Sequence, residues 1–388
     1  SPCGFIMTAG VNHQDGVLSL VVDKGIASTV QEKLQAKGLV NKKFRPRIQD
    51  NDVVIPLTNK ESVTALEWFD SNIHRIALTR LQINPVRLNP SQELLQQVTT
   101  MCEAQGLQLT DQMIECVPKK WELYGDLAII PSTSFNSIDW QKIFHDQSHL
   151  AKKVWQTTAM CLNVSRLARQ AEIADDKFRS SQVTMLLGNS GEVQFTDFGV
   201  TFWLDVTKVM FSSGNITERH RIGSIDMTGE CVVDAFAGIG YYTLPMLVRS
   251  NAKHVYALEI NPNSVLALNR GAELNGVSDR LSVIQGDNQV SMTTLSGIAD
   301  RVHLGILPSS ESTWLPAIEC LKKTGGTLHI HMNVKETEVD NFVDYCLEQL
   351  SDYAIKQLGF SRVSLKHVEK VKWYAPHVRH IVIDVAIQ

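Results

Sequence analysis

The sequence predicts an α/β protein whose last part is a doubly wound parallel sheet, preceded by smaller α/β modules. Three observations support this class. After Gly223, short β-rich runs alternate with helical patterns, as they do in parallel sheets. A glycine-containing turn at 234–240 follows the first of these runs, where an open sheet forms its ligand-binding crevice. Before Gly223, the alternation is looser and is interrupted by hairpin signals.

Length and composition limit the possible classes of protein. The 388 residues exceed one ordinary core, so we expect two or three domains. A net charge of −4 argues against a uniformly basic protein that binds nucleic acid without regard to sequence, although one basic face is compatible with it. Seven scattered cysteines without a Cys-x-x-Cys pair favour a reducing, cytoplasmic compartment without a zinc site. Without a long apolar stretch or a signal-peptide pattern, we expect no membrane association. Nothing in the sequence calls for an obligate protein partner.

The first 222 residues are expected to form two small modules joined by a connector. Residues 1–60 combine an alternating run, an amphipathic stretch and two extended runs, which predicts a β-α-β-β module. Residues 61–117 are interpreted as a connector, with one helix at Ser91–Glu103. Residues 118–222 are expected to form a middle α/β module. Its predicted elements are a strand at Trp121–Ile130, one or two helices over Trp140–Ala171, a strand at Val183–Leu187 and a hairpin over Glu192–Val206.

Residues 223–388 are expected to form the doubly wound sheet. Its predicted strands are Cys231–Phe236, His254–Ile260, Leu281–Gln285, Arg301–Leu307 and Thr327–Met332. The predicted helices between them are Tyr241–Arg249, Pro262–Asn275 and Glu311–Lys323. Two further runs, near Arg362–Glu369 and His380–Ile387, resemble the closing strand pair of the class I methyltransferase version of this Rossmann-like sheet.

The turn with the sequence Asp-Ala-Phe-Ala-Gly-Ile-Gly is a candidate cofactor site. It lies where an apolar strand passes into a helix, and its glycines let the backbone come close to a ligand. Candidate cofactor-binding residues in this turn are Asp234, Phe236, Gly238 and Gly240.

Two further strand ends carry carboxylates that suit a nucleoside. Glu259 lies about 20 residues past the turn, where a carboxylate can bind both ribose hydroxyls. Asp287 and Asn288 follow the third strand, where the carboxylate can accept a hydrogen bond from an adenine amino group. The turn has only one pair of glycines and is preceded by the carboxylate of Asp234, so it is poorly suited to bind the pyrophosphate of a dinucleotide. The combination therefore favours S-adenosylmethionine over NAD as the cofactor.

The segment after the fourth strand bears on which group of the cofactor is transferred. Many base-directed methyltransferases carry an Asn/Asp-Pro-Pro-aromatic motif there, in which the polar side chain holds the target amine and the ring stacks on the base. Here the segment reads Leu307-Pro-Ser-Ser-Glu311, and Pro308 is a further candidate cofactor contact. Since the amide and the ring are both absent, methylation of a base nitrogen is disfavoured. The methionine γ-carbon is the alternative donor, and orientation decides between the two.

Seven short motifs form a distinctive set. They are Phe211-Ser-Ser-Gly-Asn215-Ile-Thr-Glu218-Arg219, Phe236-Ala-Gly-Ile-Gly240-Tyr-Tyr-Thr-Leu-Pro245, Glu259-Ile-Asn-Pro262, Gly286-Asp-Asn288, Leu307-Pro-Ser-Ser-Glu311, His329-Ile-His331 and Tyr374-Ala-Pro-His377. As a set they resemble the tRNA wybutosine-synthesising protein 2 family, from about Trp121 to the last residue and more loosely before it. The nearest relatives of that family, the tRNA guanine-37 N1-methyltransferases, usually keep the Asn-Pro-Pro-aromatic element that this sequence lacks.

The resemblance implies a reaction and several residue roles. It implies transfer of the 3-amino-3-carboxypropyl group of S-adenosylmethionine to C7 of 4-demethylwyosine, at position 37 beside the anticodon of phenylalanine tRNA, with release of methylthioadenosine. Ser212 and Arg219 match the loop that contacts the cofactor, and Arg219 suits the methionine carboxylate or a tRNA phosphate. Glu259 matches the ribose ligand, and Asp287 with Asn288 the adenine contact. No residue is assigned as the general base.

Basic residues of the middle module are candidates for tRNA binding. They are Lys152, Lys153, Arg166 and Arg169, and a row of such residues suits a phosphate backbone, although a solvated face would look the same. His329 and His331 share one face of a strand, and we interpret them as hydrogen-bonding groups because no third metal ligand lies at a suitable spacing. Two alternatives stay open: a tRNA guanine-37 N1-methyltransferase, and a non-catalytic tRNA-binding protein that retains a cofactor pocket.

Overall fold

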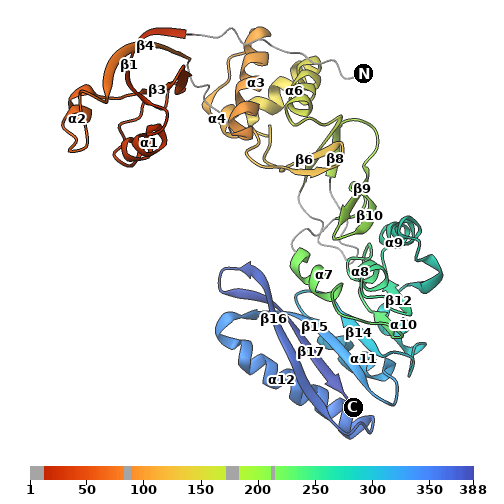
Figure 1. Cartoon of the computed structure of the whole chain (residues 1–388). Helices are drawn as coiled ribbons and strands as arrows, with labels where there is room; N and C mark the ends of the chain where they lie inside the picture. The colour runs from red at the N-terminus through yellow and green to blue at the C-terminus, as the bar shows by residue number, and fades with distance from the viewer. Residues whose placement is uncertain (1–12, 83–88, 172–182, 211–214) are drawn as a thin grey trace. The chain divides into compact units, whose positions relative to one another are not determined.

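The computed structural model describes residues 13–82, 89–171, 183–210 and 215–388 (Figure 1). Contacts between Cα atoms divide the chain into an N-terminal unit, Ser1–Asn89, and a C-terminal unit, Pro90–Gln388. No helix within the described ranges is long and apolar enough to cross a membrane.

The N-terminal unit is a four-stranded antiparallel sheet with helices packed on it. Its elements are β1 (His13–Asp23), α1 (Ala27–Ala36), β2 (Arg47–Gln49), β3 (Asp52–Pro56), α2 (Lys60–Thr64) and β4 (Arg75–Gln82), with the strand order β2-β3-β1-β4. Leu20, Leu34 and Ile55 form the centre of its core. The module expected to end at residue 60 continues to residue 82, because β4 pairs with β1 along most of its length. Half of the β4 residues are exposed, and the apolar Leu78 is among them, so the sequence lacks the apolar–polar alternation that identifies a strand.

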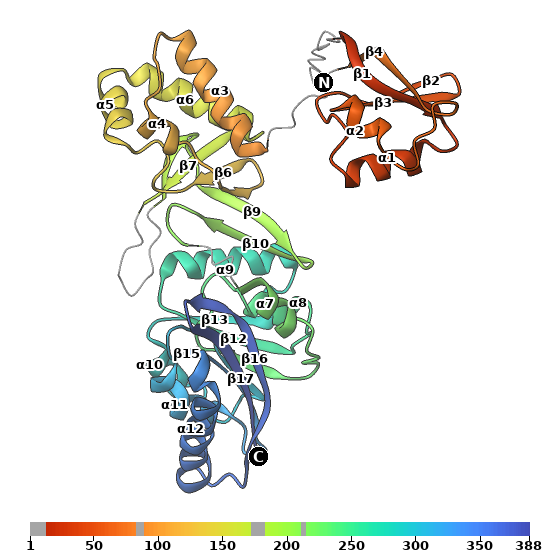
Figure 2. The same cartoon turned by 90° about the vertical axis from the view of Figure 1, so that its left-hand side faces the viewer.

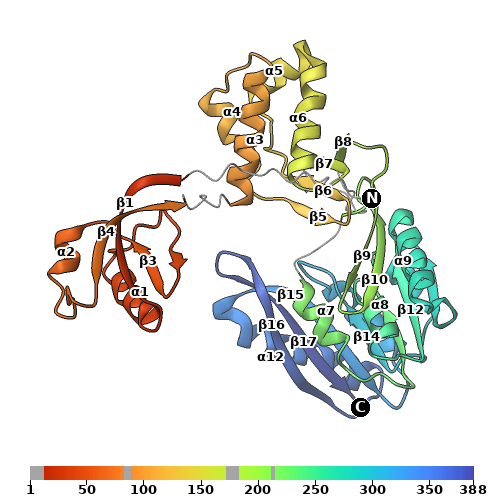
Figure 3. The ribbon, with the colours of Figure 1, turned by 45° about the horizontal axis from the view of Figure 1, so that its top comes forward.

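The first part of the C-terminal unit packs four helices against a four-stranded sheet. Its elements are α3 (Pro90–Ala104), α4 (Asp111–Glu115), β5 (Glu122–Tyr124), β6 (Leu127–Ile130), α5 (Ile138–Asp146), α6 (Ser148–Cys161), β7 (Arg166–Gln170) and β8 (Val183–Leu187). Figure 3 shows the helices gathered on one side of the strands. The expected single strand over 121–130 is a hairpin that turns at Gly125, where φ is 58°.

Helix α3 belongs to this core, although its residues were expected in the connector. Its buried positions Leu94, Val98 and Cys102 recur every four residues and therefore form one stripe. That stripe joins the cluster that also contains Trp140 and Trp155. The middle module therefore begins near residue 90, earlier than the expected 118.

A two-stranded hairpin connects this module to the C-terminal sheet. It consists of β9 (Glu192–Asp197) and β10 (Val200–Asp205), and it lies along α9 (Pro262–Asn275), as Figure 2 shows. The side chain of Asn275 on α9 exchanges two hydrogen bonds with the backbone of Thr201, at 2.7 and 2.9 Å. The hairpin shares one hydrophobic core with the large sheet.

The large sheet has seven strands and confirms the predicted class I methyltransferase architecture. Its strands, in the order β13-β12-β11-β14-β15-β17-β16, are β11 (Cys231–Asp234), β12 (His254–Glu259), β13 (Leu281–Gln285), β14 (Arg301–Leu304), β15 (Gly326–Lys335), β16 (Val363–Ala375) and β17 (Val378–Ile387). The first five in this order are parallel, and β17 is antiparallel to both of its neighbours.

Helices cover both faces of this sheet. They are α7 (Ile216–Ile222), α8 (Thr243–Val248), α9, α10 (Asn288–Thr293), α11 (Trp314–Cys320) and α12 (Val339–Ser351), with short 3₁₀ segments at Ser278–Arg280, Glu311–Thr313 and Glu336–Glu338 and a π-helical segment at Asp352–Gln357. One core lies between the sheet and α8 with α9, and a second lies between the sheet and α11 with α12. The outermost strand β16 shifts its register against β17 at three places.

Candidate cofactor and acceptor site

The glycine turn after β11 lies at the carboxyl edge of the sheet and depends on the absence of side chains. Gly238 and Gly240 have φ values of 54° and 97°, which other residues rarely adopt. A Cβ atom on Gly240 would lie 2.7 Å from side-chain carbons of Leu244 and Leu268. Gly240 therefore lets α8 and α9 pack closely, and Gly238 shapes the turn itself.

Glu259, at the end of β12, is tied directly to this turn. Its Oε2 accepts the backbone N–H of Gly238 and its Oε1 accepts that of Asn261, each at 2.7 Å. Burial raises the pKa of Glu259 above its ordinary value, while the backbone donors act in the opposite direction. The backbone N–H of Ile260 is a further donor to this carboxylate. A carboxylate has about four acceptor positions, so the group keeps a position for a hydroxyl of a ligand.

The end of the third strand lies next to Glu259 at the same edge of the sheet. Gly286 donates its N–H to the backbone oxygen of Glu259 at 3.0 Å. Asp287 is exposed and caps α10, with its Oδ1 accepting the N–H of Gln289 at 2.9 Å. The Asn288 side chain donates to the carbonyl of Ala235 at 2.9 Å and braces the glycine turn. The three strand ends chosen from the sequence are thus brought together, and their contacts with a nucleoside stay a prediction.

Asp234 and Phe236 support the turn from within the fold. Asp234 is fully buried, and its Oδ2 accepts the hydroxyl of Thr243 at 2.7 Å, which fixes the start of α8. The N–H of Phe236 points to the Asp234 Oδ1 at 3.4 Å, and its ring packs against the second core. A buried carboxylate bound in this way holds the turn in shape.

The structure places Arg219 inside the protein. Its side chain is only 2% exposed, and its Nη2 lies 3.3 Å from the Asp197 Oδ2 of the β9–β10 hairpin. The guanidinium also lies 5.9 Å from the ring centre of Phe202. Arg219 therefore links α7 to the hairpin. Ser212, the other residue predicted for the methionine end of the cofactor, lies outside the described residues.

Hydrogen bonds hold the segment after β14, residues 307–311, to β15 and to α11. The carbonyl of Pro308 accepts the backbone N–H of Asn333 on β15 at 3.0 Å. Ser310 is buried, and its hydroxyl accepts the indole N–H of Trp314 at 3.2 Å. Pro308, which follows β14, thus lies beside β15.

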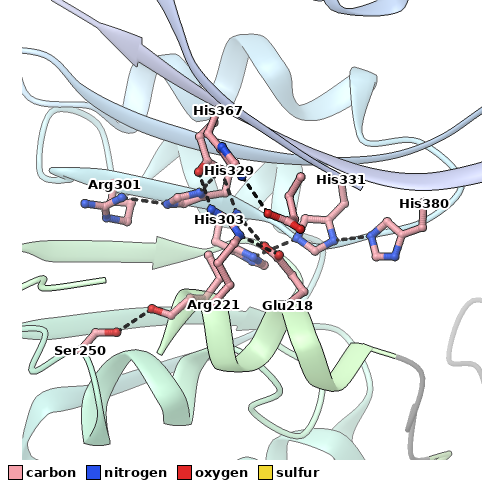
Figure 4. Close-up of polar contacts among 12 residues, drawn as sticks. Glu218, Arg221, Ser250, Arg301, His303, His329, His331, His367 and His380 are labelled. Atoms are coloured by element: carbon pink, nitrogen blue, oxygen red, sulfur yellow. Dashed lines mark hydrogen bonds and ion pairs between the residues drawn. The ribbon is translucent and has the colours of Figure 1, made fainter. Parts of the chain in front are cut away.

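A layer of four buried histidines lies between the sheet and α7 (Figure 4). They are His303 on β14, His329 and His331 on β15, and His380 on β17. His331 is hydrogen-bonded through Nδ1 to the Nε2 of His380 at 3.0 Å and through Nε2 to the Nε2 of His303 at 3.1 Å. The Nδ1 of His303 lies 3.5 Å from the Oδ1 of Asp234, so the layer reaches the glycine turn.

The contacts of His329 define its protonation state. The Arg301 guanidinium can only donate, and its Nη1 lies 2.8 Å from the His329 Nε2, so Nε2 must accept. The Nδ1–H then donates to Asp384 at 2.6 Å. Burial lowers the pKa of His329 to about 4, which agrees with a neutral ring. His329 and His331 are therefore hydrogen-bonding groups, and the described residues contain no cluster of three side chains that could hold a metal ion.

Charged groups that the sequence analysis missed connect this layer to α7. Asp384 also accepts from Arg221 at 2.7 Å, and Arg221 pairs with the buried Glu218 of the same helix at 2.7 Å. Burial raises the pKa of Glu218, although its bonds to Arg221 oppose that shift. Arg221 and Asp384 are 163 positions apart, and no local pattern marks such a pair.

The four basic residues predicted to bind tRNA differ in their surroundings. Lys152 and Lys153 are exposed on α6, and the Lys153 ammonium donates to Gln105 at 2.5 Å. Arg166 on β7 pairs with Asp126 at 2.5 Å and donates to the backbone carbonyls of Ser190 and Glu192. Arg169 is half-buried and donates to the carbonyl of Ser134 at 3.2 Å. The two lysines therefore face solvent, whereas the two arginines bind parts of their own module.

Two family models match the chain. The TRM5/TYW2 methyltransferase domain matches residues 194–358, and the TYW2 N-terminal domain matches residues 104–191. The second match agrees with a middle module that includes part of the expected connector.

Several curated proteins are similar over most of the chain. The tRNA wybutosine-synthesizing protein 2 homolog of Danio rerio is 33% identical, covering 95% of this chain and 98% of the relative. The Homo sapiens homolog is 34% identical, covering 90% and 76%. The tRNA wybutosine-synthesizing protein 2/3/4 of Arabidopsis thaliana is 36% identical over 93% of this chain. The chain spans only 35% of the length of that Arabidopsis protein and 27% of the length of its Oryza sativa counterpart.

Solved structures share the fold. Trm5b from Pyrococcus abyssi has a TM-score of 0.68 at 20% identity, covering 96% of this chain and 99% of that one. TYW2 from M. jannaschii, solved in complex with AdoMet, has a TM-score of 0.52 at 30% identity, covering 69% and 99%. TYW2 from P. horikoshii, solved in complex with MeSAdo, has a TM-score of 0.58 at 26% identity, covering 75% and 98%.

Proposed function

The chain belongs to the tRNA wybutosine-synthesizing protein 2 family, and from this premise we propose that it is a 3-amino-3-carboxypropyltransferase acting on tRNA. It uses S-adenosylmethionine to modify C7 of 4-demethylwyosine at position 37 of phenylalanine tRNA. The observation that carries this choice of reaction is the Leu307-Pro-Ser-Ser segment, which has no amide or ring to hold an acceptor nitrogen. Two family structures solved with AdoMet and MeSAdo support the cofactor.

The polar groups at the ends of β11, β12 and β13 support binding of the adenosine part of this cofactor. Beyond its backbone bonds to Gly238, Asn261 and Ile260, Glu259 keeps an acceptor position that suits a ribose hydroxyl. Asp287 is exposed and uses one oxygen as a helix cap, so the other oxygen can accept from an adenine amino group. Asn288 and Asp234 hold the turn that lies against the nucleoside, with Gly238 allowing its close approach.

The methionine end requires a separate anchor, for which we propose Ser212 and Arg219. A guanidinium carries five donors in a fork, so it can bridge the Asp197 carboxylate and the carboxylate of the cofactor. When bound, the cofactor supplies an electrophilic γ-carbon beside a sulfonium. The chain contributes by orienting that carbon toward the base and by keeping the methyl group away from it. The C7–Cγ bond forms, the Cγ–S electron pair stays on sulfur as methylthioadenosine, and the C7 proton is lost.

The tRNA substrate and the compartment are part of the same proposal. Lys152 and Lys153 are exposed on α6 and suit phosphate contacts. Arg166 and Arg169 then contribute by holding the structure of the module that carries the two lysines. The described cysteines are all free, which fits a reducing cytoplasm.

Analysis of both products tests the proposal. The chain is incubated with S-adenosylmethionine and phenylalanine tRNA that carries 4-demethylwyosine, with the same tRNA carrying guanine 37 as the control substrate. We expect methylthioadenosine and a base enlarged by one aminocarboxypropyl group, only with the precursor tRNA. S-adenosylhomocysteine together with a methylated guanine would identify a tRNA guanine-37 N1-methyltransferase instead. Absence of both by-products would leave the non-catalytic tRNA-binding protein.

A further inference from the structure

The hairpin end, residues 370–379, joins β16 to β17 and carries two exposed aromatic side chains. Trp373 and Tyr374 are consecutive in the sequence, and they are 52% and 58% exposed. The register of β16 against β17 shifts between Trp373 and Ala375, so Tyr374 is the extra residue of a β-bulge. A bulge changes the direction in which side chains leave a strand. Trp and Tyr are enriched at interaction surfaces, so the hairpin end is a candidate for one.

Charged side chains hold the ring of Trp373 in place. Arg379 lies directly opposite on β17, and its guanidinium carbon is 3.6 Å from the centre of the Trp373 ring. The Nε of Arg379 donates to the Oε2 of Glu336 at 2.6 Å, and Lys370 donates to the Oε1 of the same carboxylate at 2.8 Å. Arg379 therefore covers one face of the ring in a cation–π contact. More than half of the Trp373 side chain is still open to a flat partner.

Basic side chains outnumber acidic ones in the hairpin end and the adjoining residues 335–338. The four basic residues are Lys335, Lys370, Lys372 and Arg379, and the two acidic ones are Glu336 and Glu338. Both carboxylates pair with these cations. The next acidic residue along β16, Glu369, lies 2.8 Å from His367. This surface is therefore net positive in a chain of net charge −4. An exposed ring with surplus positive charge suits an unpaired nucleotide, whose base stacks and whose phosphate is negative.

The hairpin end lies at the same edge of the sheet as the candidate cofactor site. Lys335, the last residue of β15, pairs with Val378, the first residue of β17. β15 is parallel to β14 and β11, so it ends at the edge where the glycine turn begins (Figure 1). β16 is three strands away from β14, which is roughly 14 Å at the usual strand spacing. A base that binds Trp373 is therefore a neighbour of the acceptor base.

We propose that Trp373 stacks on an unpaired base of the tRNA loop that flanks the acceptor nucleotide. The base extends the stack that the Arg379 guanidinium and the indole ring begin, and the nearby cations contact phosphates. Every base has a flat π face, so this contact positions the loop without reading its sequence. Fixing a flanking nucleotide restricts the orientations that the acceptor base can adopt. This inference rests on the proposed function for the identity of the tRNA.

Binding of phenylalanine tRNA to four variants tests the contact. Trp373→Ala and Trp373→Leu remove the ring, and Trp373→Phe keeps one. Leu365→Ala is the matched control, because Leu365 is a 41% exposed apolar residue of β16 that pairs with Val385, far from the turn. Loss of the ring should raise the dissociation constant of the tRNA by about 5- to 150-fold. Trp373→Phe should recover most of the affinity, and Leu365→Ala should bind like the wild type.

Abasic tRNAs test the stacking itself. One unpaired loop nucleotide at a time is replaced by an abasic one, and each tRNA is titrated with wild type and Trp373→Ala. At one flanking position, removing the base and removing the ring should each weaken binding, and the two changes together should weaken it no further. The slope of the logarithm of the association constant against the logarithm of the salt concentration should be unchanged in Trp373→Ala, because stacking releases no counterions.

Wild-type affinity in both Trp373→Ala and Trp373→Leu would overturn the proposal, as would additive losses at every abasic position. A changed salt slope, or weaker binding of S-adenosylmethionine by the same variants, would also overturn it, because these results indicate altered charge contacts or a disturbed fold. Trp373→Leu decides the matter if Trp373→Ala does not fold. None of these titrations requires turnover. Release of S-adenosylhomocysteine by the wild type would therefore refute the proposed reaction and leave the stacking contact to be judged by binding alone.

Discussion

Replacing Glu259 tests the placement of the nucleoside. The carboxylate accepts two backbone hydrogen bonds at 2.7 Å, and we assign its remaining acceptor position to the ribose. Loss of charge-assisted bonding to the diol in Glu259→Ala should cost about 1.5 to 3 kcal/mol of binding free energy. At about 1.4 kcal/mol per decade, the dissociation constant of S-adenosylmethionine should rise by roughly one to two decades.

The same variant should also lower the free energy of unfolding. The N–H groups of Gly238 and Asn261 lose their acceptor, at a cost of about 1 to 3 kcal/mol for a donor that stays buried and unpaired. Gly238 is partly exposed, so water can replace the carboxylate there and reduce this cost. Glu259→Gln keeps one carbonyl oxygen and should therefore lose less stability than Glu259→Ala.

Isothermal titration calorimetry with S-adenosylmethionine and with methylthioadenosine measures the binding, and urea unfolding confirms that the variants are folded. Both ligands contain the ribose, so both should weaken by the same factor. Unchanged affinity in folded Glu259→Ala would refute the placement of the ribose. A weakening confined to S-adenosylmethionine would place Glu259 at the methionine end instead.

Two further predictions concern pH and tRNA. Burial lowers the pKa values of His329 and His380 from the ordinary 6.5 to about 4. Between pH 4 and pH 6.5, the unfolded chain therefore binds more protons than the folded chain. The free energy of unfolding should therefore hold above about pH 6.5 and fall as the pH drops toward 4, by up to about 1.4 kcal/mol per pH unit for each histidine. Urea titrations at several pH values check this, and a stability that does not change from pH 7.5 to 5 would contradict it. For tRNA, the double variant Lys152→Gln, Lys153→Gln should bind tRNA more weakly. The slope of the logarithm of its association constant against the logarithm of the salt concentration should fall by about one unit for each phosphate that is no longer neutralised. Arg166→Gln should instead lower the melting temperature, because Arg166 pairs with Asp126. Identical salt slopes for wild type and the lysine variant would place the tRNA surface elsewhere.

The C-terminal sheet could be predicted because its signals are local. Each strand is a short apolar run, and the candidate cofactor-binding residues lie at its end or just after it: Glu259 is the last residue of β12, and Asp287 lies two residues after β13. Parallel strands bring such positions together, so local sequence was enough to predict the crevice.

The remaining features depend on contacts between distant residues. Arg166 looks like a surface charge in the sequence, but Asp126 and two carbonyls bind it in the fold. β4 was missed because its apolar and polar residues do not alternate along the sequence, and its pairing with β1 defines it.

The irregular pairing of β16 has a consequence for self-association. This strand has 13 residues and is the outermost of the seven, so it offers a long row of backbone groups to any other extended chain. Its three register shifts against β17 interrupt that row, and Lys366, Lys370 and Lys372 place positive charges along it. Such bulges and lysines make an edge a poor template for another strand. The outer edge of the sheet therefore resists the edge-to-edge pairing through which β-sheets aggregate.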